Sequence, residues 1–231
     1  MKYPVVILHG WKKQGSDYHI LQIALEKRGF IVYAPDMPGF GKEKLAKNPM
    51  TIDDYVQFII TFVQKEKVKK AIFICHSFGG RVGIKLSVLH PELIDKLIMT
   101  GVPGIREKLS YRKKILSHLS KLVKKIIGNN TFAIKIVYKL LNENDYYHAG
   151  SMKDTFVAVI NEDLKEYLSQ INVQTTLIWG EDDTFVSTSI AKQMHSLIKN
   201  STYIEIPHTT HKLPYEDPQL FTKEIFSVIT I

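Results

Sequence analysis

Short apolar runs, separated by amphipathic stretches, recur along most of this 231-residue chain. Runs of this length and composition are typical of strands that are buried on both faces of a parallel sheet. Six strands are therefore predicted: Val5 to Leu8, Phe30 to Ala34, Ala71 to Cys75, Leu93 to Thr100, Thr175 to Trp179 and Thr202 to Ile206.

The stretches between these runs carry apolar residues at the spacing of an α-helix. Helices are predicted at Tyr18 to Arg28, Thr51 to about Gln64, Phe78 to Leu89, Ser187 to Ile198 and Tyr215 to Ile229. Strands that alternate with helices predict an α/β fold, here a mostly parallel sheet of about six strands with helices on both faces.

The strand pattern stops between residues 104 and 165. Leu109 to Ile127 is predicted to form a basic amphipathic helix, Phe132 to Leu141 a second helix, and Met152 to Glu166 one or two more. We therefore expect an inserted helical cap over residues 104–165 and a core built from residues 1–103 and 166–231. Ligands bind at the carboxyl ends of the strands in such sheets, and the cap should cover that edge.

The net charge of +8 is concentrated in the predicted cap. Ten Lys and Arg residues and one acid, Glu107, lie between Pro103 and Asn142, so the rest of the chain sums to 21 − 22 = −1. A general affinity for nucleic acid explains this distribution poorly. Three interpretations stay open: a solvated helix face, attraction of anionic substrates, or weak contact with an anionic lipid surface.

The only cysteine, Cys75, excludes an internal disulfide. No apolar run approaches the ~18 residues of a membrane span, and Val5 to Leu8 is too short for the core of a signal peptide. These features favour the cytoplasm. No metal-ligand cluster or phosphate-binding glycine loop is evident, so neither a metal nor a cofactor is expected. The oligomeric state is not predicted.

Ala71 to Gly80 runs from a buried strand through a tight turn into a helix, with Ser77 at the apex. The turn fits the nucleophile elbow G-x-S-x-G, with Cys75 in the place of the first glycine. The alternative is a serine that only caps a strand–helix turn.

Three further polar groups follow predicted strands: His9-Gly10-Trp11, Asp183 and His211. The carboxyl ends of parallel strands share one edge, so these groups should meet Ser77 there. Acyl transfer by a serine requires a base, an acid that orients the base, and donors for the oxyanion.

Five stretches in this order resemble the α/β hydrolases over nearly the whole chain: His9-Gly10, Ala34 to Gly41, His76 to Gly80, Ile178 to Asp183, and His211 with Glu216-Asp217-Pro218. The resemblance implies that Ser77 is the nucleophile, that His211 is the base, and that Asp183 orients it. It also implies an oxyanion hole formed by the backbone N–H groups of Trp11 and Phe78.

The same resemblance implies two weaker catalytic candidates and two structural histidines. Asp182 is a weaker candidate for the acid, because the family spacing is Gly-x-x-Asp counted from Gly180. His208 is a weaker candidate for the base. His76 is expected to support the loops around the elbow, and His9 to make structural hydrogen bonds.

The function implied is that of a serine hydrolase, of carboxylesterase type, which cleaves an ester of a small or acyl-chain substrate through an acyl-enzyme. Thioester, lactone, amide and carbon–carbon bond hydrolysis are alternatives on the same fold. Ser77 argues against haloalkane and epoxide chemistry, which would use an aspartate nucleophile. The Gly-Gly-Ser-Trp-Gly elbow of prolyl aminopeptidases is absent. A ligand receptor with little turnover is the alternative from a different class.

Overall fold

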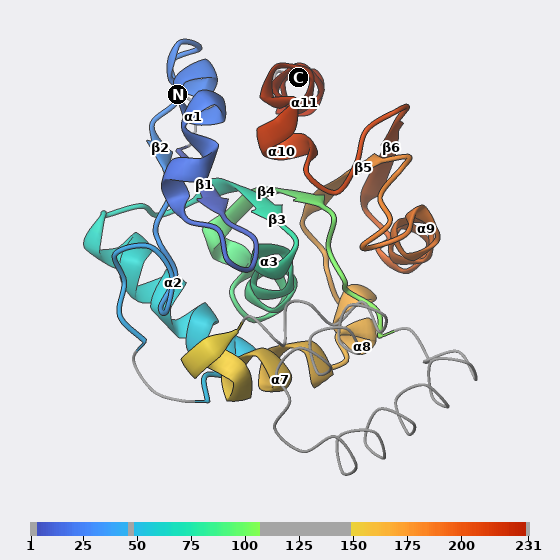
Figure 1. Ribbon diagram of the computed structural model, residues 1–231. Coiled ribbons are helices and arrows are strands. Elements are labelled where there is room, and N and C mark those ends of the chain that lie inside the picture. Colours follow the sequence, from blue (N-terminus) through green and yellow to red (C-terminus); the bar gives the residue numbers. More distant parts are fainter. Residues whose placement is uncertain (1–3, 46–48, 107–148, 230–231) are drawn as a thin grey trace, which may run out of the picture.

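The computed structural model describes residues 4–45, 49–106 and 149–229. Within these residues, six strands form one sheet in the order β2-β1-β3-β4-β5-β6, and every neighbouring pair is parallel (Figure 1). The strands are β1 (Val5–Leu8), β2 (Val32–Tyr33), β3 (Ala71–His76), β4 (Ile94–Thr100), β5 (Gln174–Gly180) and β6 (Ser201–Ile206). The predicted fold class is confirmed, with a sheet that is parallel throughout.

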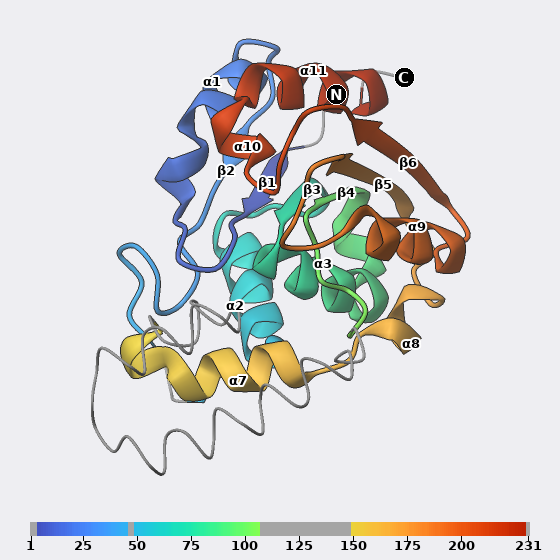
Figure 2. The same cartoon turned by 45° about the vertical axis from the view of Figure 1, so that its right-hand side comes forward.

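Helices cover both faces of this sheet (Figure 2). They are η1 (Gly15–Tyr18), α1 (His19–Glu26), α2 (Ile52–Lys65), α3 (Phe78–Leu89), η2 (Pro91–Leu93), η3 (Gly150–Met152), α7 (Lys153–Asn161), α8 (Lys165–Leu168), α9 (Thr188–Leu197), α10 (Leu213–Glu216) and α11 (Pro218–Ile229). None of the helices in the described ranges is long and apolar enough to cross a membrane.

Alternation along the strands divides the core into two halves. On β1, Val5 and Ile7 pack with the apolar side chains of α1, α10 and α11. Val6 and Leu8 point to the opposite face and pack with those of α2, α3, α8 and α9. Strands buried on both faces need continuous apolar runs, which is why the sequence shows such runs.

Most predicted boundaries shift by one or two residues, and two predicted elements change more in form. The expected helix from Tyr215 to Ile229 is divided into α10 and α11 at Asp217, which has φ −131° and ψ 67°. Pro218 disfavours a helical conformation at the residue before it, so the first helix ends there. The expected strand from Phe30 to Ala34 is shortened to β2, an edge strand that pairs with β1 alone among the described residues.

Residues 149–165, the larger described part of the expected cap, lie against the rest of the chain beside α2 and α3. Thr155 of α7 accepts a hydrogen bond from the Met50 backbone N–H at 3.0 Å, and α7 lies below α2 and α3 in both views (Figures 1 and 2). The predicted basic helix Leu109 to Ile127 and the helix Phe132 to Leu141 lie outside the described residues, so the cap boundaries stay a prediction.

Helix α3 approaches the sheet so closely that only glycine fits at its start. A Cβ on Gly79 would lie 2.3 Å from the Leu8 carbonyl oxygen, and a Cβ on Gly80 would lie 2.0 Å from Val102 Cγ2. The Gly79 N–H also donates to the His9 carbonyl oxygen at 3.1 Å. The first turn of α3 is therefore fixed against the end of β1.

This close approach predicts an unusual cost for Gly79→Ala. Alanine normally favours a helix over glycine, but here its methyl group meets backbone that cannot move aside, so we expect a loss of about 3 kcal/mol or more in the free energy of unfolding. Gly29→Ala is the matched control, because its Cβ would meet open space and only its φ of +81° is unfavourable, at about 1 kcal/mol. Urea unfolding of both variants measures the two losses in the free energy of unfolding. Equal losses in Gly79→Ala and Gly29→Ala would contradict the prediction.

Candidate functional site

Ser77 lies at the turn between β3 and α3 in a strained backbone conformation. Its φ is 51° and its ψ is −112°, a region that costs a residue with a side chain about 1 kcal/mol or more. The conformation is held by a hydrogen bond from the Ser77 N–H to the Thr100 carbonyl oxygen at 2.9 Å and by one from the Gly80 N–H to the Ser77 carbonyl oxygen at 3.0 Å. The turn thus presents the partly exposed serine at the carboxyl edge of the sheet.

Cys75 occupies the position of the elbow's usual first glycine, and the structure compensates for its size on the facing helix. A Cβ on Gly83 of α3 would lie 2.8 Å from Cys75 Sγ, so the missing side chain of Gly83 makes room for the thiol. Burial raises the pKa of the Cys75 thiol well above its usual range, which keeps the thiol neutral and unreactive.

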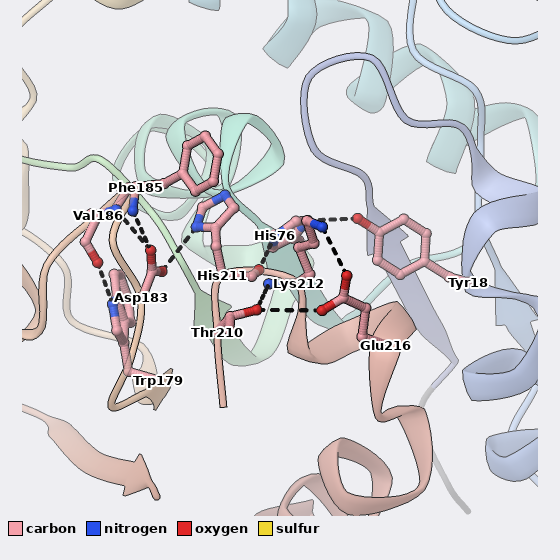
Figure 3. A network of polar contacts seen from close by, with 10 residues as sticks. All are labelled: Tyr18, His76, Trp179, Asp183, Phe185, Val186, Thr210, His211, Lys212 and Glu216. Carbon is pink, nitrogen blue, oxygen red and sulfur yellow. Dashed lines mark hydrogen bonds and ion pairs between the residues drawn. The ribbon is translucent and has the colours of Figure 1, made fainter. Parts of the chain in front are cut away.

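Asp183 and His211, which lie on separate loops, are joined by a short hydrogen bond. His211 Nδ1 lies 2.8 Å from Asp183 Oδ2 (Figure 3). The second carboxylate oxygen, Oδ1, accepts from the backbone N–H groups of Phe185 at 2.9 Å and Val186 at 2.8 Å. A buried carboxylate with three donors is held in one orientation. Because the carboxylate accepts, Nδ1 carries the proton, and Nε2 is left with its lone pair.

Ser77 and His211 both border the segment that follows β4. Ser77 is bonded to Thr100, and the His211 ring lies against Gly101, where a Cβ would be 2.7 Å from the imidazole. Within the described part of the chain, no hydrogen bond joins Ser77 Oγ to His211. Such bonds are often long before substrate binds.

The two residues expected to supply the oxyanion donors, Trp11 and Phe78, contact each other through their side chains. The aromatic rings of Trp11 and Phe78 pack edge to face, with centroids 5.4 Å apart. Neither backbone N–H donates a hydrogen bond to another described residue. The ring of Phe156 on α7 lies 5.0 Å from that of Trp11, so α7 contributes to the cover over this region.

The weaker sequence candidates lie apart from this arrangement. Asp182 and His208 are exposed, and neither side chain belongs to the contact network of Figure 3. His9 is structural, as expected: its Nε2 accepts from the Met37 N–H at 2.9 Å, so its Nδ1 donates to the Gly10 carbonyl oxygen at 2.8 Å.

His76 links the three loops of the site through a chain of hydrogen bonds whose direction is fixed. Its Nε2 lies 3.0 Å from the His211 carbonyl oxygen, which can only accept, so Nε2 carries the proton. Nδ1 must then accept from the Tyr18 hydroxyl at 2.7 Å, and that hydroxyl accepts from the Gly10 N–H at 3.2 Å (Figure 3). The expected loop-supporting role of His76 is confirmed. Tyr18 could not be found from sequence, because 58 residues separate it from His76.

His76 is held neutral in the folded protein. Burial is the main cause that lowers its pKa well below the usual 6.5, and the neighbouring His211 lowers it further. Among the described residues, no cluster of His, Cys, Asp and Glu could hold a metal ion.

The lowered pKa of His76 predicts acid sensitivity. Below about pH 6.5 the unfolded chain binds a proton at His76 and the folded chain does not. The free energy of unfolding therefore has its full value above that pH and decreases as the pH falls, by up to about 1.4 kcal/mol per pH unit for this one proton. His76→Gln keeps a donor for the His211 carbonyl oxygen. It should reduce the slope of the free energy of unfolding against pH by up to the contribution of one proton, about 1.4 kcal/mol per pH unit. Urea unfolding between pH 7.5 and about 5 measures it.

His19→Gln, at an exposed histidine of α1, is the control for losing a histidine. It should keep the wild-type slope. A His76→Gln slope that matches the wild-type slope would show that His76 titrates normally.

Comparisons with known proteins agree with this fold. The family model described as "Serine aminopeptidase, S33" matches residues 1–218. One curated relative is a pimeloyl-[acyl-carrier protein] methyl ester esterase of Wigglesworthia glossinidia brevipalpis, which is 27% identical over 96% of this chain and 91% of the relative. Another is a 2-hydroxy-6-oxo-6-(2'-aminophenyl)hexa-2,4-dienoic acid hydrolase of Metapseudomonas resinovorans, which is 26% identical over 98% of this chain and 84% of the relative. The solved structure of an esterase from Exiguobacterium antarcticum has a TM-score of 0.79 at 20% identity, covering 99% of this chain and 92% of that one.

Proposed function

This chain belongs to the serine aminopeptidase family of the α/β hydrolases, and we propose that it is a serine hydrolase that cleaves a carboxylic ester through an acyl-enzyme intermediate. One observation carries the proposal: a hydrogen bond of 2.8 Å joins the buried Asp183 to His211 at the edge of the sheet where Ser77 forms a strained elbow. A base oriented by a buried acid beside a serine is the arrangement that acyl transfer requires.

In the proposed mechanism, Ser77 Oγ attacks the ester carbonyl carbon while His211 Nε2 takes its proton. The backbone N–H groups of Trp11 and Phe78 stabilise the negative oxygen that forms. Asp183 stabilises the imidazolium. His211 then gives the proton to the departing alcohol oxygen, which leaves an acyl group on Ser77. Water, deprotonated by His211, then attacks the acyl carbon, and His211 returns that proton to Ser77 Oγ as the bond to the acyl group breaks, which releases the acid and restores the free serine.

A cavity beside the site, at Trp11, has room for a small acyl or aryl group. This cavity of about 450 Å³ adjoins Trp11 and is lined by apolar side chains that include Phe40, Leu45 and Met152, with Lys12 and Glu43 as its charged residues. Ligand cavities of this size and character take small molecules. Contact of the predicted basic cap helix with an anionic lipid surface stays a prediction, since that segment lies outside the described residues.

Two relatives support different bonds. The esterase relative is named for a methyl ester, and the dienoic acid hydrolase relative makes carbon–carbon bond hydrolysis the second candidate. A panel of aryl acyl esters of increasing chain length, with thioesters, lactones and a 6-oxo-dienoic acid alongside, separates the candidates. We expect the aryl esters to have the highest kcat/KM, and a higher value for the dienoic acid would favour the second candidate.

The nucleophile is tested by Ser77→Ala. We expect ester turnover to fall by about four orders of magnitude or more, because the acyl-enzyme cannot form, while the melting temperature stays close to that of the wild type. Activity within about tenfold of the wild type would refute the assignment of Ser77.

The acid is tested by two neighbouring substitutions of the same kind. Asp183→Asn should lower kcat by about a thousandfold or more, because the amide no longer fixes the His211 tautomer or stabilises its cation. The exposed Asp182 provides the matched control, and Asp182→Asn should change kcat only a few-fold. The reverse ranking would move the role to Asp182.

A further inference from the structure

A second cavity, of about 300 Å³, lies beside the loop that carries Asp183. Its walls include the loop Thr184–Ser187, the apolar side chains of Ile105 and Ile160, and two arginines, Arg81 and Arg106. Phe185 connects it to the site, because the Phe185 ring also packs on the imidazole of His211 with centroids 5.3 Å apart. A group bound in this cavity would therefore lie one side chain away from the proposed base.

Arg81 is a buried cation that forms no ion pair with a described residue. Its side chain is only 4% exposed. Its two terminal nitrogens donate to the backbone carbonyls of Pro103 and Glu162, which are neutral acceptors, and its Nε–H has no acceptor in the described part of the chain. Burial lowers the pKa of Arg81 to about 10, although the nearby charges of Glu162 and Asp163 act in the opposite direction. A buried charge in this state is costly unless an anion comes close to it.

The acids near Arg81 are already engaged by other groups. The Glu162 carboxylate lies 2.6 Å from Lys85 Nζ, and Asp163 accepts from the Lys165 N–H at 3.0 Å. No Asp or Glu is among the residues that line the cavity.

Arg106 places a second guanidinium on the same wall, at the surface. It is exposed and donates to Asn161 Oδ1 at 3.1 Å, again a neutral acceptor. None of the ion pairs among the described residues involves Arg81 or Arg106. An arginine that is held by neutral acceptors keeps its full charge for an incoming anion.

We propose that this cavity is a subsite for a carboxylate at the end of a short aliphatic chain, carried by the substrate. Arg106 binds the carboxylate directly. The buried Arg81, on the same wall, attracts the carboxylate through its charge without touching it. Ile105 and Ile160 pack against the methylene groups. This inference rests on the proposed function, since it names the class of ester that the site takes: one that carries a second, free carboxylate.

The test compares two aryl esters of equal length. The mono-aryl ester of glutaric acid ends in a carboxylate, and the aryl ester of pentanoic acid ends in a methyl group. The measured quantity is the ratio of kcat/KM for the anionic ester to that for the neutral ester. Arg106→Gln should lower this ratio about tenfold or more, the usual effect of losing one charged hydrogen bond, mainly through a higher KM. Arg106→Lys should retain part of the preference.

Arg28→Gln is the matched control, because it removes the same charge from an exposed arginine whose guanidinium lies 4.4 Å from the Phe226 ring, away from the cavity. It should leave the ratio at the wild-type value. An unchanged ratio in Arg106→Gln, or an equal fall in Arg28→Gln, would overturn the subsite.

Calorimetric titration with glutarate separates the subsite from the proposed function. Glutarate should bind the wild type and Ser77→Ala alike and bind Arg106→Gln at least tenfold more weakly. If the wild type hydrolyses neither ester but glutarate binds through Arg106, the subsite stands and the ester function fails. If the esters are hydrolysed without preference and glutarate does not bind, the function stands and the subsite fails.

Discussion

The close approach of helix α3 to the ends of β1 and β4 is the constraint on which the site depends. Gly79 and Gly80 allow it, because any side chain there would overlap Leu8 or Val102. The approach forces the chain through a sharp turn, and Ser77 takes up that turn with a positive φ. Strain of this kind persists only where the surrounding structure holds it, and it is common where a side chain must be presented for chemistry.

Two histidines 5.0 Å apart have opposite tasks around this turn. His211 has one nitrogen bound to the Asp183 carboxylate, which fixes the orientation of its ring. His76 has both nitrogens bound, to the Tyr18 hydroxyl and the His211 carbonyl, and it is buried away from carboxylates, so it stays neutral. A neutral His76 connects the elbow to the His211 loop without placing a competing charge beside the proposed base.

The sequence predicted the parts of this structure that depend on local patterns. Continuous apolar runs identified all six strands, and the glycines after Ser77 identified the elbow, because each follows from a steric rule that acts over a few residues. The pairing of Asp183 with His211 came from resemblance to a family and not from the pattern itself.

Features that depend on contacts between distant residues could not be predicted. Tyr18 lies in an ordinary amphipathic stretch, and only the folded chain brings its hydroxyl to His76. Gly83 resembles any helix glycine until Cys75 Sγ is seen against it. Arg81 appears as one basic residue of a helix, and its buried, unpaired charge arises because the carbonyls of Pro103 and Glu162, 22 and 81 residues away, enclose it.

In the proposed mechanism, the Asp183–His211 pair makes the Ser77 hydroxyl nucleophilic. Intact-protein mass spectrometry after incubation with an aryl fluorophosphonate tests it directly, because only an activated serine displaces the fluoride. We expect the wild type to gain one phosphonyl group, located on Ser77 by peptide mapping, and we expect labelling of His211→Ala to be slower by orders of magnitude. Wild-type protein that stays unlabelled, or labelling of Ser77 at the same rate without His211, would contradict it.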